Sequence, residues 1–432
     1  MRAVHTSMCM TSTSDECQRF GVESEVIAQM AQEKSITMST GTRPRLILMM
    51  IGRGGGGHKA TACAVEAALR RSFSEGALEI RMVDTGYLVE SFSTGREMRT
   101  KGFDFDEFYN LLMQYNFFRL AGAIGYLSGL MFAVLGGSIK RGLEKFFAAE
   151  QPDLVMSFVP FFNACFRDSL SASCSNAPLL TCITDFTSTS AHCWIDAWAF
   201  EASAQHYIIA GGQLLQQQAA ALGYPKEHII ATPGMVVHPS FHDDEEQQKQ
   251  PKQQLVAQLT ALIFFGGCAP MRVESIVQGL RSSHPGIEVV VICGKNEVLR
   301  KRLAARGDCL VEGYIPPSRV LSLMRRASFI LGKPGPGVVS EACATGTPYV
   351  TEDRNVMPQE RSVLDWITDS GAGFVVGSLA KLPDDLLGRV EKCRMAIATL
   401  RAVQPAVWTV AEAVHRLLLQ GRLALDEDKP RK

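Results

Sequence analysis

Two glycine-rich turns hold the side chains best suited to catalysis or ligand binding in this chain. The first, Gly54–His58, follows an apolar run at 45–51 and precedes alanines at helical spacing. The second spans residues 333–342, with the sequence KPGPGVVSEA. A strand, a glycine turn and a helix leave backbone N–H groups free at the helix N-terminus, where they can bind a diphosphate.

One titratable side chain accompanies each turn. His58 is expected at the start of the first helix, and an imidazole titrates near working pH, as a general base should. Glu341 is expected in the first turns of the second helix, where a carboxylate can accept from two ribose hydroxyls. Either turn alone also fits an ordinary strand–helix connection. Two such turns in two halves of one chain favour two nucleotide-binding domains that face each other.

Apolar runs bounded by glycine or polar residues indicate the strands that place these turns. We predict strands at residues 45–51, 78–83, 152–158, 178–184, 205–209, 228–232, 262–265, 287–293, 309–311, 327–331 and 348–351. We predict helices between them, at 59–73, 271–283, 297–306, 317–326, 338–345 and 361–369. The alternation predicts an α/β fold with two doubly wound parallel sheets.

Asp185 follows its strand at the carboxyl edge of the first sheet, near the expected place of His58. An ordinary turn or helix-cap role for Asp185 stays equally open.

Changes in composition along the chain indicate its domain boundaries. Residues 1–42, rich in Ser and Thr with mixed charge, are expected to form a disordered leader. Two globular domains are expected at 43–240 and 257–420. The Gln-rich stretch at 241–256 is expected to be a polar linker or insertion, and 421–432 a charged tail.

Charge and cysteine content exclude some classes of partner. The formal net charge is 0 at pH 7, which argues against nucleic acid as a partner. The 12 cysteines include no Cys-x-x-Cys pair and fall mostly in apolar runs. This distribution favours buried, reduced thiols over disulfides or a metal site.

The region 102–141 has an unusual composition. It begins with an aromatic cluster and continues with an uncharged run at 120–139. The run is long enough for a membrane span, but its glycines weaken both helix stability and hydropathy. We expect a buried or monotopic membrane-facing helix first, and a true span second. The basic residues at its ends, Arg119, Lys140 and Arg141, suit an anionic membrane surface.

Three blocks of this sequence resemble a known family. They are residues 55–60 (GGGHKA), the turn at 333–342, and the pair Gln359-Glu360. Thr184-Asp185 with its downstream tryptophan, and residues 234–241, match more loosely. The chain is similar in these blocks to monogalactosyldiacylglycerol synthases and diacylglycerol glucosyltransferases. These are GT-B glycosyltransferases of family 28 type, in the superfamily of the peptidoglycan enzyme that makes lipid II.

The resemblance implies a fold, a reaction and roles for the motif residues. It implies two Rossmann-like domains around a cleft, with a membrane-facing acceptor domain at 43–240 and a UDP-sugar domain at 257–420. The reaction would be inverting transfer of galactose or glucose from a UDP-sugar to diacylglycerol. The resemblance assigns catalysis to His58, and the acceptor loop to Gly55, Gly56 and Gly57. We predict Asp185 as a second catalytic residue, from its expected place beside His58 at the edge of the sheet. The nucleotide-sugar site would comprise Gly266, Gly267, Lys333, Gly335, Gly337, Glu341, Gln359 and Glu360.

The UDP-sugar would be the donor substrate, and no cofactor is implied. A helix N-terminus can stabilise a leaving diphosphate, so we also expect no metal in the chemistry. The loop at 266–270 has fewer glycines than the family's usual loop, which puts phosphate contacts there in question.

Two alternatives stay open. The chain could be a catalytically silent GT-B protein that binds lipid or a partner through 102–141, or an N-acetylglucosaminyltransferase with a lipid-linked, peptidoglycan-type acceptor. The expected location is a membrane surface. It would be the plastid envelope in a photosynthetic organism and otherwise the cytoplasmic face of a membrane.

Overall fold

The computed structural model describes residues 43–52, 56–92, 137–173, 177–186, 193–198, 205–243, 259–354, 356, 360–401 and 405–427. Several sequence predictions therefore lie outside the described residues. They are the leader at 1–42, nearly all of the uncharged run at 120–139, the linker beyond residue 243, and the site residues Gly55 and Gln359.

The N-terminal domain is built on six parallel strands in the order β2-β1-β3-β4-β5-β6. β1, β3 and β4 are buried over nearly their whole length, which accounts for their continuous apolar runs. The strands are β1 (Arg45–Ile51), β2 (Leu78–Asp84), β3 (Leu154–Ser157), β4 (Leu179–Cys182), β5 (His206–Gly211) and β6 (Ile229–Thr232).

The C-terminal domain repeats this arrangement with six parallel strands in the order β12-β11-β10-β7-β8-β9. The strands are β7 (Thr260–Phe264), β8 (Glu288–Ile292), β9 (Leu310–Glu312), β10 (Phe329–Leu331), β11 (Tyr349–Glu352) and β12 (Gly373–Val376). Two doubly wound parallel sheets confirm the predicted fold class.

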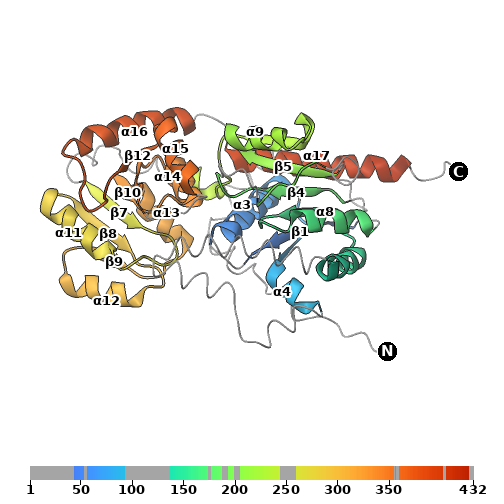
Figure 1. Cartoon of the computed structure of the whole chain (residues 1–432), viewed down its shortest axis with the longest axis horizontal. Coiled ribbons are helices and arrows are strands. Elements are labelled where there is room, and N and C mark those ends of the chain that lie inside the picture. The colour runs from blue at the N-terminus through green and yellow to red at the C-terminus, as the bar shows by residue number, and fades with distance from the viewer. Residues whose placement is uncertain are drawn as a thin grey trace.

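Helices cover the faces of both sheets (Figure 1). Those that follow the N-terminal strands are α3 (Gly56–Ser72), α4 (Thr85–Ser91), a helix at residues 137–150, α8 (Asn163–Ala172), α9 (Gln213–Ala221) and the short turns η1 (Lys226–His228) and η2 (Pro239–Phe241). Those that follow the C-terminal strands are α11 (Val273–Ser283), α12 (Glu297–Arg306), α13 (Pro317–Arg326), α14 (Pro336–Thr345), α15 (Arg361–Ser370), α16 (Leu386–Arg401) and α17 (Ala406–Glu427).

The strand order reverses beside the first strand of each sheet, and the glycine turns lie at the carboxyl ends of strands at these reversals. β1 lies between β2 and β3, and β7 lies between β8 and β10. Ligands of open α/β sheets bind beyond the carboxyl ends of strands at such a reversal. His58 follows β1, while Gly266 and Lys333 follow the neighbouring strands β7 and β10. The strands approach so closely that a Cβ at Gly332 would overlap the carbonyl oxygen of Phe264.

The last helix, α17, packs against the N-terminal domain, although it follows the C-terminal domain in sequence (Figure 1). Its buried face shares one apolar cluster with β1 and α3. The residues it contributes are Ala406, Val407, Val410, Ala411, Val414, Leu417 and Leu418. The predicted C-terminal domain boundary at residue 420 is therefore wrong in this part. The residues predicted as a charged tail begin within the same helix, which continues to Glu427.

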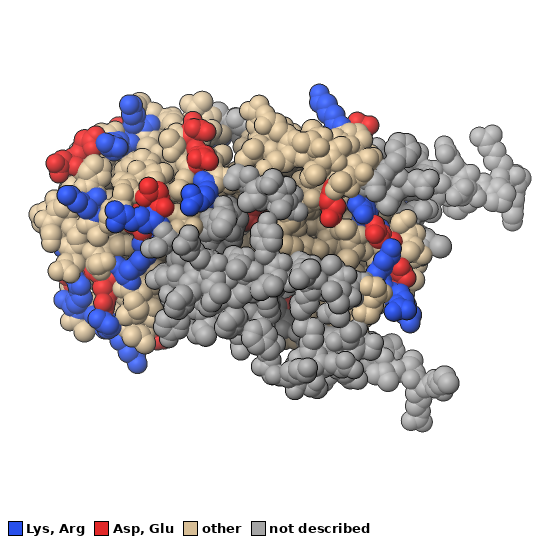
Figure 2. All heavy atoms as spheres, viewed as in Figure 1, with Lys and Arg blue, Asp and Glu red and all other residues tan. Residues whose placement is uncertain are grey.

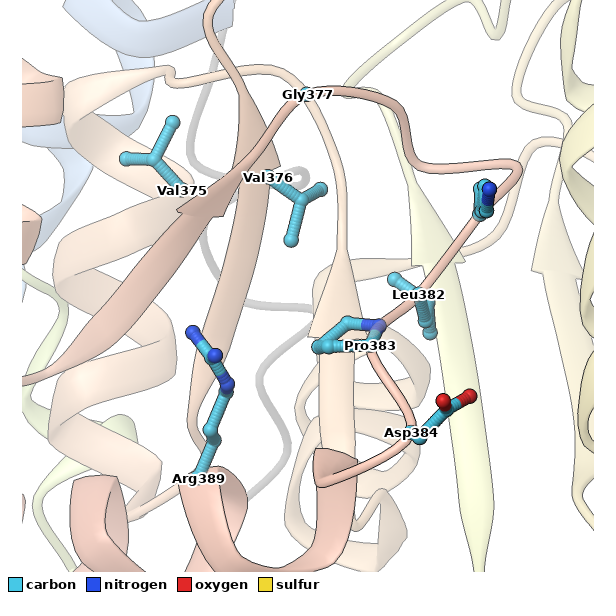
Figure 3. A pocket seen from close by; sticks show the side chains of 8 residues that line it. Val375, Val376, Gly377, Leu382, Pro383, Asp384 and Arg389 are labelled. Atoms are coloured by element: carbon cyan, nitrogen blue, oxygen red, sulfur yellow. The ribbon is translucent and has the colours of Figure 1, made fainter.

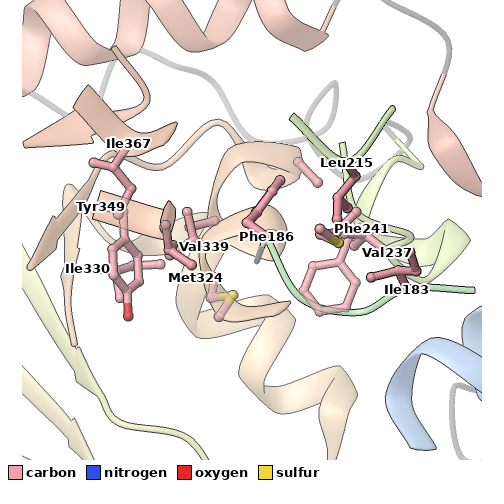
Figure 4. Close-up of a cluster of buried hydrophobic side chains, with 14 of the residues drawn as sticks. Ile183, Phe186, Leu215, Val237, Phe241, Met324, Ile330, Val339, Tyr349 and Ile367 are labelled. Atoms are coloured by element: carbon pink, nitrogen blue, oxygen red, sulfur yellow. The ribbon is translucent and has the colours of Figure 1, made fainter. Parts of the chain in front are cut away.

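A second apolar cluster joins the two domains. It contains Ile183 and Phe186 after β4, Phe241 of η2, and Val339 and Ala342 of α14. Figure 4 shows Phe186 between the side chains of the two domains. The Phe186 ring also stacks on Trp366 of α15, with centroids 5.3 Å apart and planes 19° apart. The domains therefore meet through close apolar packing next to the carboxyl end of β4.

Among the described residues, no helix has the length and apolar character needed to cross a bilayer. The described end of the region 102–141 begins a helix whose Ile139, Leu143 and Phe147 pack on the N-terminal sheet. Acidic and basic side chains are interspersed over the C-terminal domain on the face shown in Figure 2.

The packing of α17 predicts a large effect for one of two adjacent leucines. Leu418 is 3% exposed and Leu419 is 39% exposed. Leu418→Ala should lower the free energy of unfolding by about 3 kcal/mol, because it leaves a cavity in the N-terminal core. Leu419→Ala, the matched control, should change it by less than about 1 kcal/mol. Urea unfolding followed by fluorescence measures both, and equal effects would contradict the docking of α17.

Candidate functional site

The acceptor-side candidates meet at the carboxyl edge of the N-terminal sheet. Gly56 and Gly57 begin α3 and are exposed, and His58 is the third residue of this helix, as the sequence predicts. Nδ1 of His58 lies 2.9 Å from Oγ1 of Thr184, which follows β4. The structure thus brings the first glycine turn next to the strand end that carries Asp185.

Asp185 is held by a tryptophan. The indole Nε1–H of Trp194 donates to Oδ2 of Asp185 over 2.9 Å. The same indole lies against His58, with ring centroids 5.6 Å apart. One fully buried side chain, Trp194, therefore contacts both residues predicted to be catalytic.

The surroundings of His58 favour its neutral form. Burial lowers the pKa of His58 below its usual 6.5, and the nearby negative charge of Asp185 opposes this shift. When Nδ1–H donates to Thr184, Nε2 is left with a free lone pair that can accept a proton. Asp185 can then stabilise the imidazolium that forms. This arrangement is suited to general base catalysis.

On the donor side, an ion pair and a tyrosine hold the second glycine turn. Nζ of Lys333 lies 3.0 Å from Oε1 of Glu360, which is buried just before α15. The hydroxyl of Tyr349, in β11, donates to the carbonyl oxygen of Lys333 over 2.7 Å. The turn is therefore anchored to the next strand and the next helix.

The turn leads into a helix that can receive an anion. α14 begins with Gly335 as N-cap and Pro336 in its first turn, and no side chain caps it. Its first N–H groups therefore remain available for a ligand, and the helix dipole favours negative charge there. After the neighbouring strand β7, Gly266 has a φ of +85°, which only glycine adopts easily, and Gly267 is exposed.

Glu341 lies one turn into α14 as a partly buried carboxylate. No hydrogen bond or ion pair to its side chain occurs among the residues that the structure describes. Burial raises the pKa of Glu341 from 4.5 to about 7. Ligand hydroxyls that donate to this buried carboxylate would stabilise its charged form.

The interdomain cluster relates the two groups of candidates. Phe186 follows Asp185 directly, and Val339 and Ala342 flank Glu341 on α14; all three side chains belong to this cluster. η2 also contacts both α3, which carries His58, and α14. The two groups are thus positioned by one body of packed side chains.

The glycine turns are evident in the sequence, whereas the side chains that support them are not. Thr184 belongs to the Thr184-Asp185 motif and Trp194 is the tryptophan downstream of it, but the sequence predicts no contact for either. Tyr349 and the pairing of Lys333 with Glu360 had no signal in the sequence, because each joins segments far apart in the chain. Gly55 and Gln359 lie outside the described residues, so their predicted roles stay predictions.

The described residues contain no cluster of three or more His, Cys, Asp or Glu side chains that could bind a metal. Two Asp-x-Asp sequences are present, Asp104–Asp106 and Asp426–Asp428. The first lies outside the described residues, as does Asp428 of the second. The expectation of a metal-independent reaction therefore stays a prediction.

A pocket of about 350 Å³ lies at the end of β12, beside the start of α16 (Figure 3). Its lining combines apolar residues with Lys381, Asp384 and Arg389. None of the predicted site residues lines it. This pocket therefore lies apart from the candidate site.

The raised pKa of Glu341 predicts a pH dependence of stability in the ligand-free protein. Between pH 4.5 and about 7 the folded state keeps a proton that the unfolded state has lost. The free energy of unfolding should therefore fall as pH rises through this window, by up to about 3 kcal/mol. Glu341→Gln should remove this fall, whereas Glu391→Gln, an exposed change on α16, should retain it. Urea unfolding at pH 5 and pH 7.5 tests this, and an unchanged slope in Glu341→Gln would refute it.

Comparisons with known proteins agree with the motifs. The chain is 22% identical over 397 residues to monogalactosyldiacylglycerol synthase 1, chloroplastic, of Arabidopsis thaliana, covering 87% of this chain and 72% of that protein. It is 26% identical over 298 residues to a processive diacylglycerol beta-glucosyltransferase of Bacillus thuringiensis, covering 64% of this chain and 72% of that protein. No protein-family model matches the chain.

A solved structure agrees with the fold. The crystal structure of MurG from Acinetobacter baumannii superposes with a TM-score of 0.52 at 14% identity, covering 86% of this chain and 100% of that one. The predicted GT-B fold is therefore confirmed. The predicted resemblance is also confirmed: the chain is similar over most of its length to monogalactosyldiacylglycerol synthases and, over a shorter part, to a diacylglycerol glucosyltransferase.

Proposed function

We propose that this protein transfers galactose or glucose from a UDP-sugar to diacylglycerol with inversion at the anomeric carbon. The product would be a membrane glycolipid such as monogalactosyldiacylglycerol. One observation carries the proposal: a general-base arrangement around His58 and an anion-receiving turn beside Glu341 are positioned by one interdomain cluster. The names of the similar proteins support diacylglycerol as the acceptor and galactose or glucose as the transferred sugar.

The C-terminal domain would bind the donor. The ribose hydroxyls would donate to Glu341, which has no other partner among the described residues. The first N–H groups of α14 and the ammonium of Lys333 would face the diphosphate. Gln359 and Glu360 would contact the sugar hydroxyls, with Lys333 keeping Glu360 oriented.

The N-terminal domain would activate the acceptor. Nε2 of His58 would take the proton of the diacylglycerol hydroxyl as its oxygen attacks the anomeric carbon. The bond from that carbon to the diphosphate breaks at the same time, and UDP leaves with the electron pair. Attack opposite the leaving group inverts the anomeric configuration. Asp185, held by Trp194, would stabilise the imidazolium.

Diacylglycerol is a membrane lipid, so we propose that the protein works at a membrane surface as a peripheral protein. The region 102–141, most of which lies outside the described residues, is the proposed contact with anionic lipid. The plant relative is described as chloroplastic, which supports the plastid envelope if this chain comes from a photosynthetic organism.

A transfer assay tests the proposal directly. Purified protein is mixed with diacylglycerol in anionic liposomes and with radiolabelled UDP-galactose or UDP-glucose, with and without a chelator. A labelled glycolipid from one donor, unaffected by the chelator, is the expected result. Donor binding without product would favour another acceptor, such as a lipid-linked sugar. Neither binding nor product would favour a silent protein that binds lipid or a partner.

His58→Ala should abolish transfer while leaving UDP-sugar binding intact, because the base lies in the domain opposite the donor site. Turnover by thin-layer chromatography and binding by calorimetry measure the two effects. The lowered pKa of His58 also predicts that wild-type turnover persists below pH 6.5. Wild-type turnover in His58→Ala would remove this residue from the mechanism.

Glu341→Ala should weaken the binding of UDP by about 2 kcal/mol, the effect of losing a hydrogen bond to a charged group. Calorimetric titration with UDP measures this. Glu391→Ala serves as a control on an exposed helix of the same domain. Equal affinities in wild type and Glu341→Ala would contradict the ribose role.

A further inference from the structure

A line of buried polar side chains crosses the N-terminal domain and ends at the loop that carries Trp194. The hydroxyl of Tyr224 lies 2.9 Å from Nδ1 of His206. Nε2 of His206 lies 2.8 Å from Oγ1 of Thr181. Thr181 donates to Oδ1 of Asn163 over 3.2 Å, and Asn163 donates to the carbonyl oxygen of Trp194 over 3.0 Å.

The direction of every hydrogen bond in this line follows from its last members. The hydroxyl proton of Thr181 is given to Asn163, so Thr181 must accept from His206. His206 therefore carries its proton on Nε2, which leaves Nδ1 to accept from the Tyr224 hydroxyl. The amide of Asn163 donates to Trp194 and, over 3.1 Å, to the carbonyl oxygen of Val159. The Thr181 hydroxyl, both ring nitrogens of His206 and the amide nitrogen of Asn163 are therefore all hydrogen-bonded.

The side chains of this line are deeply buried, so they would destabilise the fold unless all their hydrogen bonds were made. Asn163 is 1% exposed, Thr181 0% and His206 1%. Polar groups at such positions lose their water and must be fully hydrogen-bonded. Burial lowers the pKa of His206 to about 3, so the ring stays neutral near neutral pH and keeps its acceptor. Apolar side chains could fill a sheet core at lower cost, so the line calls for a role beyond packing.

The two ends of the line hold the same short loop. At residue 194, Asn163 binds the backbone oxygen, while the indole binds Asp185 and lies against His58. At residue 198, the tryptophan ring packs edge-on against Tyr224, with centroids 5.0 Å apart. The N–H of Trp198 also donates to the carbonyl oxygen of Leu222 over 2.8 Å. Loop 193–198 is therefore fixed at both ends by one network.

We propose that Asn163, Thr181 and His206 are positioning residues that hold loop 193–198, so that the Trp194 indole orients Asp185 and His58 for proton transfer. None of the three touches these two residues, so they act through Trp194. The proposal rests on the proposed glycosyl transfer for its catalytic part and on geometry alone for its structural part.

Thr181→Val tests the proposal, because it keeps the shape of the side chain and removes the central hydroxyl. We expect kcat for transfer to fall about tenfold, since small displacements of catalytic groups are costly, with KM for the UDP-sugar unchanged. Thr181→Ser restores the hydroxyl and should recover most of kcat. Ser169→Ala is the matched control: Ser169 lies on α8, as Asn163 does, and its buried hydroxyl donates to the backbone carbonyl oxygen of Lys140 over 3.2 Å. It should leave kcat unchanged.

An NMR measurement follows Trp194 without any need for activity. The chain has 4 tryptophans, so indole-¹⁵N labelling yields few signals, and Trp194→Phe assigns the relevant one. In Thr181→Val this signal should move and exchange faster with solvent, and in Ser169→Ala it should not. If Thr181→Val fails to fold, Tyr224→Phe removes only the outermost hydroxyl and should produce a smaller change of the same kind.

The indole NMR signal and kcat together distinguish failure of the proposed function from failure of the proposed positioning role. A shifted indole in Thr181→Val with no transfer by any protein, wild type included, refutes the proposed function and supports the fixing of the loop. An unmoved indole in both Thr181→Val and Tyr224→Phe overturns the inference. A shifted indole with wild-type kcat overturns the catalytic part of the inference while the proposed function stands.

Discussion

The apolar cluster between the domains is the constraint on which the rest of the site depends. Ile183 and Phe186 enter it from the loop that carries Asp185, and Val339 and Ala342 enter it from the helix that carries Glu341. Protein cores are packed too densely for such side chains to shift independently. The spacing between the acceptor-side and donor-side groups is therefore set by side-chain packing, including the stack of Phe186 on Trp366.

The two sides reach their geometry by different physical means. The donor side uses close backbone approach at Gly332, an uncapped helix end and the partly exposed pair of Lys333 with Glu360. In the N-terminal domain, a line of buried, neutral hydrogen bonds runs from Tyr224 to the backbone of Trp194. Neutral networks of this kind are strong only when complete, so each polar side chain of the line is sensitive to substitution. In the C-terminal domain the sensitive position is instead Gly332, where any Cβ would overlap the carbonyl oxygen of Phe264.

Local pattern was enough to predict most of the fold. The helix at 297–306 and the helix at 317–326 match α12 and α13 residue for residue, because each begins beside Asn or Pro and follows a clear strand. His58 and Glu341 could be placed for the same reason, since each follows a glycine turn within a few residues. These features depend only on neighbours in sequence.

Features that join distant segments could not be predicted. Nothing near Trp194 or Thr184 says which ring or hydroxyl lies opposite, and Tyr349 looked like an ordinary strand residue. The packing of residues 406–418 on the N-terminal domain, rather than on the domain predicted at 257–420, has a related cause. An amphipathic helix shows that one face is buried, but its sequence does not say which sheet covers that face.

The docking of α17 also sets an order of events during synthesis. The N-terminal sheet is made first, yet its cover at Ala406–Leu418 leaves the ribosome only after the whole C-terminal domain. Until then, the face of β1 and α3 that α17 will cover stays open, and exposed apolar surface of this kind invites aggregation or chaperone binding. The N-terminal domain is thus complete only when α17 has been made, and residues 43–240 expressed alone should not form a stable domain.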